Sequence, residues 1–253
     1  MPSTETWAAK RRTHTTITTL VFAAASLLSI VPASADQAPK PAPTAAVTPI
    51  APAAPSVAER LRVAPSASRA DSVVLVWTGR VEAGMADAIA RAFEQHKATT
   101  RRILLTIDSG GGSVPEGRRV IDVLKRIRDT HQLDTYVKPG SRCGSMCVPI
   151  YLQGQTRYAA TSSLWLFHEV SIRDLKTKQI TKLDRPAFQK LVDDYFIPAG
   201  VSKEWLADMM PKTEGADYWQ TGEALIREKS NIIHKATSDT NQRTVVEKAA
   251  PAH

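Results

Sequence analysis

The middle of the chain, from about residue 71 to 235, alternates short apolar runs with segments whose apolar residues recur every three or four positions. Short runs of Val, Ile, Leu and Trp that end near Gly, Pro or Asp are typical of buried strands. We therefore expect strands at 73–77, 103–107, 135–137, 157–159 and 164–167. The wider spacing predicts helices at 86–96, 120–127, 183–195, 202–210 and 221–228. A further short helix is expected to begin near Ser145, because Pro149 is tolerated only in a first turn.

This order of elements predicts the fold class. Strands that are apolar nearly throughout are covered on both faces, as in parallel sheets whose strands are joined by helices. We therefore expect one α/β domain built from βαβ units over residues 71–235. Functional groups of such domains collect at the carboxyl ends of the strands. A glycine triplet at 110–112, Ser145 and His168 all follow ends of expected strands.

The first 35 residues carry the pattern of a secretory signal peptide. Three basic residues at 10–12 precede an apolar stretch at 17–31, and small residues at 33–35 form a cleavage site. The apolar stretch is shorter than the ~20 residues that a membrane span needs, although an uncleaved anchor is the alternative. We therefore expect export to a bacterial periplasm or beyond, and no membrane span in the mature chain.

Two further segments lack the patterning of a folded domain. Residues 36–70 are mostly Ala, Pro and Thr, and residues 236–253 are polar and unpatterned. Segments of this kind bury too little apolar surface to offset the entropy of ordering them. We expect a disordered linker and a disordered tail on either side of the domain.

The chain is basic, with a formal net charge of +8. The basic residues are dispersed along the sequence and are not interleaved with aromatic residues, as they are in proteins that stack nucleic-acid bases. The charges are therefore interpreted as a solvated surface, and no nucleic-acid partner is expected.

The glycine triplet, Gly110 to Gly112, separates an expected strand from an expected helix. It fits neither of the common phosphate-binding patterns, because Arg118 and Arg119 stand where a P-loop has Lys and Ser or Thr, and Gly117 is misplaced for a dinucleotide fingerprint. The turn is either a tight connection or a source of N–H groups that stabilise an oxyanion.

Ser145 and His168 are candidates for acyl-transfer chemistry, which needs a nucleophile, a base and oxyanion donors. Each residue alone has an ordinary structural interpretation, as a helix cap or a packed histidine. His168 and Glu169 do not open a zinc motif, because Ile172 occupies the place of its second histidine. We expect no metal and no cofactor. A cysteine nucleophile is ranked below serine, because exported compartments oxidise thiols.

The order of these motifs resembles the proteolytic subunit of Clp protease. The resemblance covers about residues 73–231, and it is carried by the segments 107–112, 140–146 and 166–168 together with Gly154 and Arg157. It implies a single domain with the ClpP/crotonase-like spiral α/β fold. It also implies a peptide or unfolded-protein substrate and a homo-oligomer.

The resemblance also assigns roles to single residues. Ser145 is the implied nucleophile and His168 the implied general base. The backbone N–H groups of Gly111 and Met146 are the implied oxyanion donors. Asp217 is the best match to the acid, with Glu214 as the alternative. The chain has no lysine between 138 and 176, which disfavours the Ser–Lys dyad of membrane-associated relatives.

Cys143 and Cys147, the only two cysteines, stand on either side of Ser145. Residues four apart in a helical turn have Cα atoms about 6 Å apart, a separation that a disulfide accepts. Export and spacing together predict a Cys143–Cys147 disulfide that fixes the turn carrying the serine.

The sequence thus predicts an exported serine protease, a hydrolase that uses a Ser–His–Asp triad without ATP. The alternative is a non-catalytic protein of the same fold that binds a peptide or an envelope partner. Acyl-CoA chemistry on the related crotonase fold is disfavoured by export, since CoA is cytoplasmic.

Overall fold

The computed structural model describes four stretches of the chain: residues 56–66, 69–174, 176–177 and 179–238. All described residues belong to one compact unit, which lies within residues 52–253. The expected signal peptide at 1–35 lies outside the described residues. So do most of the expected linker at 36–70 and of the expected tail at 236–253.

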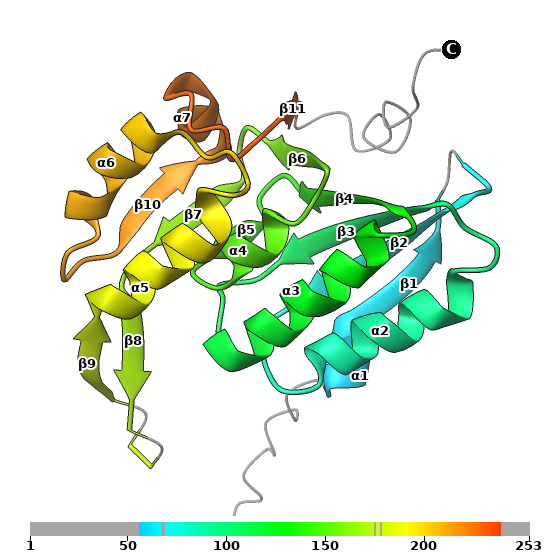
Figure 1. The fold of residues 1–253 in the computed structure, drawn as a ribbon, viewed down its shortest axis with the longest axis horizontal. Helices are drawn as coiled ribbons and strands as arrows, with labels where there is room; N and C mark the ends of the chain where they lie inside the picture. The colour runs from blue at the N-terminus through cyan, green and yellow to red at the C-terminus, as the bar shows by residue number, and fades with distance from the viewer. Residues whose placement is uncertain (1–55, 67–68, 175, 178, 239–253) are drawn as a thin grey trace, which may run out of the picture. The chain divides into compact units, whose positions relative to one another are not determined.

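A six-stranded sheet forms the larger layer of the domain (Figure 1). Its strands, in spatial order, are β1 (Leu61–Pro65), β2 (Ser72–Thr78), β3 (Arg102–Asp108), β4 (Gln132–Val137), β6 (Thr156–Ala160) and β11 (Lys235–Thr237). All neighbouring pairs are parallel except β1 and β2. The central strand β3 is buried from Ile103 to Ile107, which explains its continuous apolar sequence.

Helices α2 (Met85–His96) and α3 (Val114–Arg128) lie along one face of this sheet (Figure 1). Each turns an apolar stripe inward, and the stripes pack in the same core as Leu75, Trp77 and Leu105 of the sheet. The start of α3 is fixed by Ser113, whose side chain accepts a hydrogen bond from the Glu116 N–H at 3.2 Å. The helix therefore begins directly after the glycine triplet.

A three-stranded sheet forms a second layer. It consists of β5 (Arg142–Gly144), β7 (Leu164–Phe167) and β10 (Tyr218–Thr221), with β7 in the middle. Strand β5 runs parallel to β7 and leads through a short turn into α4 (Cys147–Tyr151). The middle of β5 also bridges to the residue that follows β3, where Ser109 pairs with Cys143. The two sheets therefore meet at the glycine turn.

The remaining elements surround these sheets. Strands β8 (Val170–Arg173) and β9 (Ile180–Asp184) form an antiparallel hairpin. The helical segments are α1 (Val57–Arg60), α5 (Arg185–Leu191), the π-helical η1 (Val192–Phe196), α6 (Lys203–Lys212) and α7 (Gly222–Arg227). None of the described helices is long and apolar enough to cross a membrane.

The mixed α/β architecture confirms the expected fold class, and the main strands and helices lie where the apolar pattern places them. Strand β1 falls within the range 36–70 that was expected to be a linker. The apolar pattern does not predict β1, because it is an edge strand whose residues are almost all exposed. The helix expected at 183–195 begins instead at Arg185, because Leu183 belongs to β9 and Asp184 caps the helix by accepting from the Ala187 N–H.

Candidate active site

Ser145 occupies a tight turn between β5 and α4. Its backbone φ is +51°, a left-handed conformation that is uncommon for residues other than glycine. The turn is held on both sides, because the Ser145 N–H donates to the Leu166 carbonyl at 2.8 Å and the Ser145 carbonyl accepts from the Val148 N–H at 3.0 Å. Conformations of this kind cost roughly 1–3 kcal/mol and cluster at functional sites.

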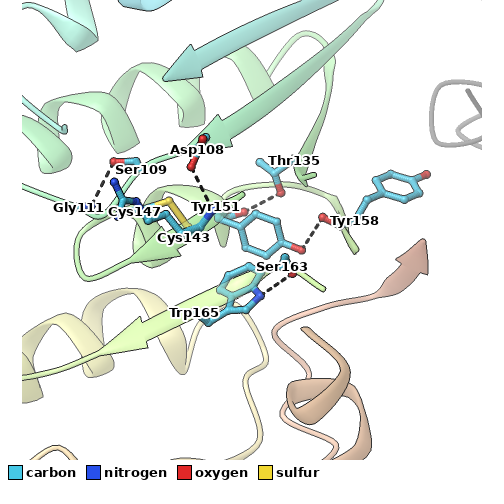
Figure 2. The surroundings of a disulfide bond; sticks show 11 residues. Asp108, Ser109, Gly111, Thr135, Cys143, Cys147, Tyr151, Tyr158, Ser163 and Trp165 are labelled. Atoms are coloured by element: carbon cyan, nitrogen blue, oxygen red, sulfur yellow. Dashed lines mark hydrogen bonds between the residues drawn. A yellow bond between two sulfur atoms is a disulfide. The ribbon is translucent and has the colours of Figure 1, made fainter. Parts of the chain in front are cut away.

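A disulfide joins Cys143 to Cys147 across this turn, as the sequence predicts (Figure 2). The two Cα atoms are 5.3 Å apart, and both side chains are fully buried. Cys143 lies in β5, and Cys147 is the first residue of α4. The bridge therefore connects the strand that enters the serine turn to the helix that leaves it.

The far end of α4 is fixed by buried hydrogen bonds around Tyr151 (Figure 2). The Thr135 hydroxyl donates to the Tyr151 carbonyl at 2.8 Å, and the Tyr151 hydroxyl donates to the Tyr158 carbonyl at 3.1 Å. Burial raises the pKa of Tyr151, so its hydroxyl keeps the proton that it donates. The Tyr151 ring also packs edge-on against Trp165 of β7, with ring centres 4.9 Å apart. The helix behind Ser145 is thus a rigid support.

Gly111 lies directly against the serine turn. A Cβ atom added to it would come within 2.6 Å of the Ser145 Cβ and 3.1 Å of the Met146 nitrogen, and its φ is +91°. Only glycine fits such an approach. The two expected oxyanion donors, Gly111 and Met146, are therefore brought together beside Ser145.

The two expected donors differ in their hydrogen bonds. The Gly111 N–H donates to the Ser109 hydroxyl at 3.1 Å. Among the hydrogen bonds formed within the described residues, none uses the Met146 N–H. Of the two N–H groups, that of Met146 is therefore the one without a partner in the described part of the chain and free to donate to a developing oxyanion.

Ser145 and His168 line one small cavity, of about 50 Å³. His168 follows the last residue of β7 and is half-buried. The rest of the wall is mostly apolar and includes Val114, Pro149, Leu166, Phe188 and Phe196. Within the described structure no hydrogen bond joins Ser145 to His168. Such bonds often tighten only when a substrate binds.

The His168 ring is held by a main-chain group. Its Nδ1 atom lies 2.5 Å from the carbonyl oxygen of Glu169. A carbonyl oxygen can only accept, so Nδ1 carries the proton in the neutral ring and Nε2 has a free lone pair. This is the tautomer that a general base needs when Nε2 removes the serine proton.

Neither candidate acid forms a hydrogen bond or an ion pair with His168 within the described residues. Asp217 directly precedes β10, and His168 directly follows β7. The Tyr218–Phe167 pair at this end of the ladder therefore brings the two backbones close. The Asp217 side chain is exposed, however, and forms no hydrogen bond or ion pair within the described residues. Glu214 is 71% exposed and pairs with Arg185 at 3.2 Å.

Glu169 is a buried carboxylate at the site that the sequence motifs do not single out. Its side chain is 8% exposed. One oxygen accepts from the Gly215 N–H at 3.3 Å, and the other lies 3.6 Å from the Arg185 guanidinium. The sequence carries no signal for its contact with His168, because that contact uses the main chain. No described cluster of His, Cys, Asp and Glu could hold a metal ion.

Comparisons with known proteins bear on the fold. No protein-family model matches the chain, and no curated protein matches it. Among solved structures, a ClpP1 mutant from Listeria monocytogenes matches with a TM-score of 0.51 and 15% identity, covering 67% of this chain and 94% of that one. The ClpP protease catalytic domain from Plasmodium falciparum matches with a TM-score of 0.48 and 19% identity, covering 66% and 84%. The chain has a ClpP-like α/β fold, as the motif resemblance implies.

Proposed function

We propose that this chain is an exported serine peptidase that acts without ATP, with Ser145 as nucleophile and His168 as general base. One observation carries the proposal. Ser145 has a φ of +51° beside Gly111 and Met146, and it shares a cavity with a histidine whose Nδ1 is already bonded. Neither a helix cap nor a packed core histidine needs this combination.

The proposed reaction follows from the positions of these groups. The Ser145 hydroxyl attacks the substrate carbonyl carbon while His168 Nε2 takes the hydroxyl proton. Negative charge then develops on the substrate oxygen, and the N–H groups beside Ser145 stabilise it, with Met146 contributing most directly. His168 returns the proton to the leaving amine. A water molecule then releases the acyl group by the same steps in reverse order.

The cavity beside Ser145 limits the substrate. Its volume of about 50 Å³ and its apolar wall fit a small apolar side chain. We therefore expect cleavage of peptides or unfolded segments after residues such as Ala or Val, and weak cleavage after charged residues.

The remaining parts of the proposal concern compartment and assembly. A buried disulfide is typical of exported proteins, because the cytosol keeps most thiols reduced. It supports export to the periplasm or beyond. The homo-oligomer rests on the motif resemblance and is proposed on that ground. Ile172, Ile180 and Leu183 of the β8–β9 hairpin are exposed apolar side chains available for such contacts.

Hydrolysis of a fluorogenic peptide pool, without ATP, tests the proposal. Wild-type protein should cleave peptides, Ser145→Ala and His168→Ala should not, and Ser141→Ala should behave as wild type. Ser141 is the matched control because it lies four residues before Ser145 and does not line the cavity. Equal cleavage by wild type and Ser145→Ala would refute the proposed role of Ser145.

A non-catalytic binding protein of the same fold is the second candidate. Its specific support is that the Gly111 N–H is bonded to Ser109 and that Asp217 is exposed. If it is correct, Ser145→Ala should retain full function in the native host. Loss of function in that variant, at unchanged protein level, favours the peptidase.

A further inference from the structure

We infer that the main-chain carbonyl of Glu169 takes the place of the triad carboxylate, and that the buried Glu169 side chain is the positioning group that holds this carbonyl. The inference rests on the proposed function, because it concerns how His168 is oriented toward Ser145. It replaces Asp217 as the partner of the histidine.

The contact itself is the first step. A triad carboxylate accepts the Nδ1–H bond of the histidine and so fixes both the tautomer and the ring orientation. In this chain the Glu169 carbonyl accepts that bond, with the two atoms 2.5 Å apart. Nδ1 has one hydrogen, so a second strong acceptor such as Asp217 has no proton left to share.

The anchoring of Glu169 is the second step. The residue lies between the end of β7 and the start of β8, and its side chain is 8% exposed. The carboxylate accepts from the Gly215 N–H at 3.3 Å and lies 3.6 Å from Arg185, the first residue of α5. A single buried side chain therefore ties the His168 loop to two other segments. Rotation of residue 169 would move the carbonyl away from the ring.

The surroundings of Asp217 are the third step. Its side chain is exposed and makes no hydrogen bond or ion pair with any described residue. An exposed carboxylate acts on the ring only through solvent, where charges at 4 Å interact by about 1 kcal/mol. Removing Asp217 should therefore change the reaction far less than removing a triad acid, which costs about 10⁴-fold in rate.

Proton transfer balances without a carboxylate. The Ser145 proton moves to Nε2, while the Nδ1 proton stays bonded to the Glu169 carbonyl. The ring then carries one positive charge, which the carbonyl dipole stabilises. Returning the Nε2 proton to the leaving group restores the neutral ring.

The first test of the inference is kinetic. It measures the rate at which a fluorophosphonate labels Ser145 in the full chain. Asp217→Ala should label within about 10-fold of wild type, since only solvent-screened charge is lost. Glu169→Ala should label at least about 100-fold more slowly, a loss in the range of a misplaced catalytic group. Glu169→Gln should recover most of the rate, because its amide oxygen still accepts from Gly215. Glu214→Gln is the matched control, since Glu214 also pairs with Arg185 but is exposed, and its rate should be unchanged.

The histidine tautomer tests the inference in a second arm that does not depend on catalysis. Nitrogen-15 NMR of the full chain, with His168 assigned from a His168→Gln variant, should show the proton on Nδ1. The signal should be the same in Asp217→Ala and should change in Glu169→Ala. A proton on Nε2, or a tautomer that changes in Asp217→Ala, would overturn the inference. So would a rate loss near 10⁴-fold in Asp217→Ala. Absence of labelling in wild type with the Nδ1 tautomer present would refute the proposed function alone.

Discussion

Removal of the Cys143–Cys147 disulfide should destabilise the domain by a small and calculable amount. The bridge closes a loop between residues four apart in sequence. According to the loop-closure relation, such a crosslink lowers the entropy of the unfolded chain and so raises its free energy by about 2 kcal/mol at 25 °C. For a domain of this size that corresponds to a fall in Tm of roughly 4–8 °C.

A double-mutant cycle separates the crosslink from the loss of buried sulfur. Both side chains are fully buried, so each Cys→Ala change should add about 1 kcal/mol for lost packing. Cys143→Ala and Cys147→Ala should then each cost about 3 kcal/mol, and the double variant about 4 kcal/mol. The coupling energy is the double-variant cost minus the two single costs, and it should be about −2 kcal/mol.

Urea unfolding without reductant measures the four free energies of the cycle. Costs that add to within about 0.5 kcal/mol would refute the reasoning, because independent sites behave in that way. Repeating the cycle in a strong thiol reductant is the control, and the coupling should then vanish. The single variants should also label more slowly at Ser145, since the bridge fixes both sides of its turn.

Three further predictions concern the glycine turn, a buried arginine and a histidine. Gly111→Ala should abolish Ser145 labelling and lower the free energy of unfolding, because the added Cβ would lie 2.6 Å from the Ser145 Cβ. Gly140→Ala is the control for backbone strain alone, because Gly140 has a φ of +70° and no atom lies near an added Cβ. Arg157→Met should cost about 1–3 kcal/mol in urea unfolding, because it leaves the buried Ile232 carbonyl without its donor. The part-buried carbonyls of Ala199 and Asn231 also lose this donor but can turn to water. A loss below about 0.5 kcal/mol would contradict this. Partial desolvation, and then the charge of Arg157, lowers the pKa of the exposed His234 below its ordinary value of 6.5, so stability should fall slightly as pH drops through and below 6.5. His234→Gln should show a smaller fall between pH 7.5 and 5.5, and an equal fall in both proteins would contradict the assignment.

The sequence predicts the parts of the fold that depend on burial. A strand could be predicted at residues 103–107, because β3 is buried on both faces and its sequence is apolar throughout. A helix could be predicted at 86–96, because α2 buries one stripe of apolar residues. Strand β1 could not be predicted, because its residues are almost all exposed and carry no apolar pattern. It is a strand because its backbone pairs with β2, and that pairing is not visible in the sequence. The same holds for the exposed strand β9, which occupies the start of an expected helix.

The candidate site divides in a similar way. Ser145, His168, Gly111 and the disulfide follow from residue types and spacing, because glycine is required where backbones meet and cysteines four apart can be bridged. The partner of His168 does not follow, because it is a main-chain carbonyl, a group that every residue carries. The exposure of Asp217 depends on tertiary packing that no local pattern encodes.

Mapping the fluorophosphonate adduct by mass spectrometry tests the central claim most directly. Trypsin should release a peptide of residues 143–157, in which Ser145 is the only serine. The account predicts one adduct per chain on Ser145, none in the Ser145→Ala variant, and loss of peptide hydrolysis in step with labelling. Full hydrolysis by a chain whose Ser145 carries the adduct, or an adduct on another residue that accounts for the lost activity, would contradict it.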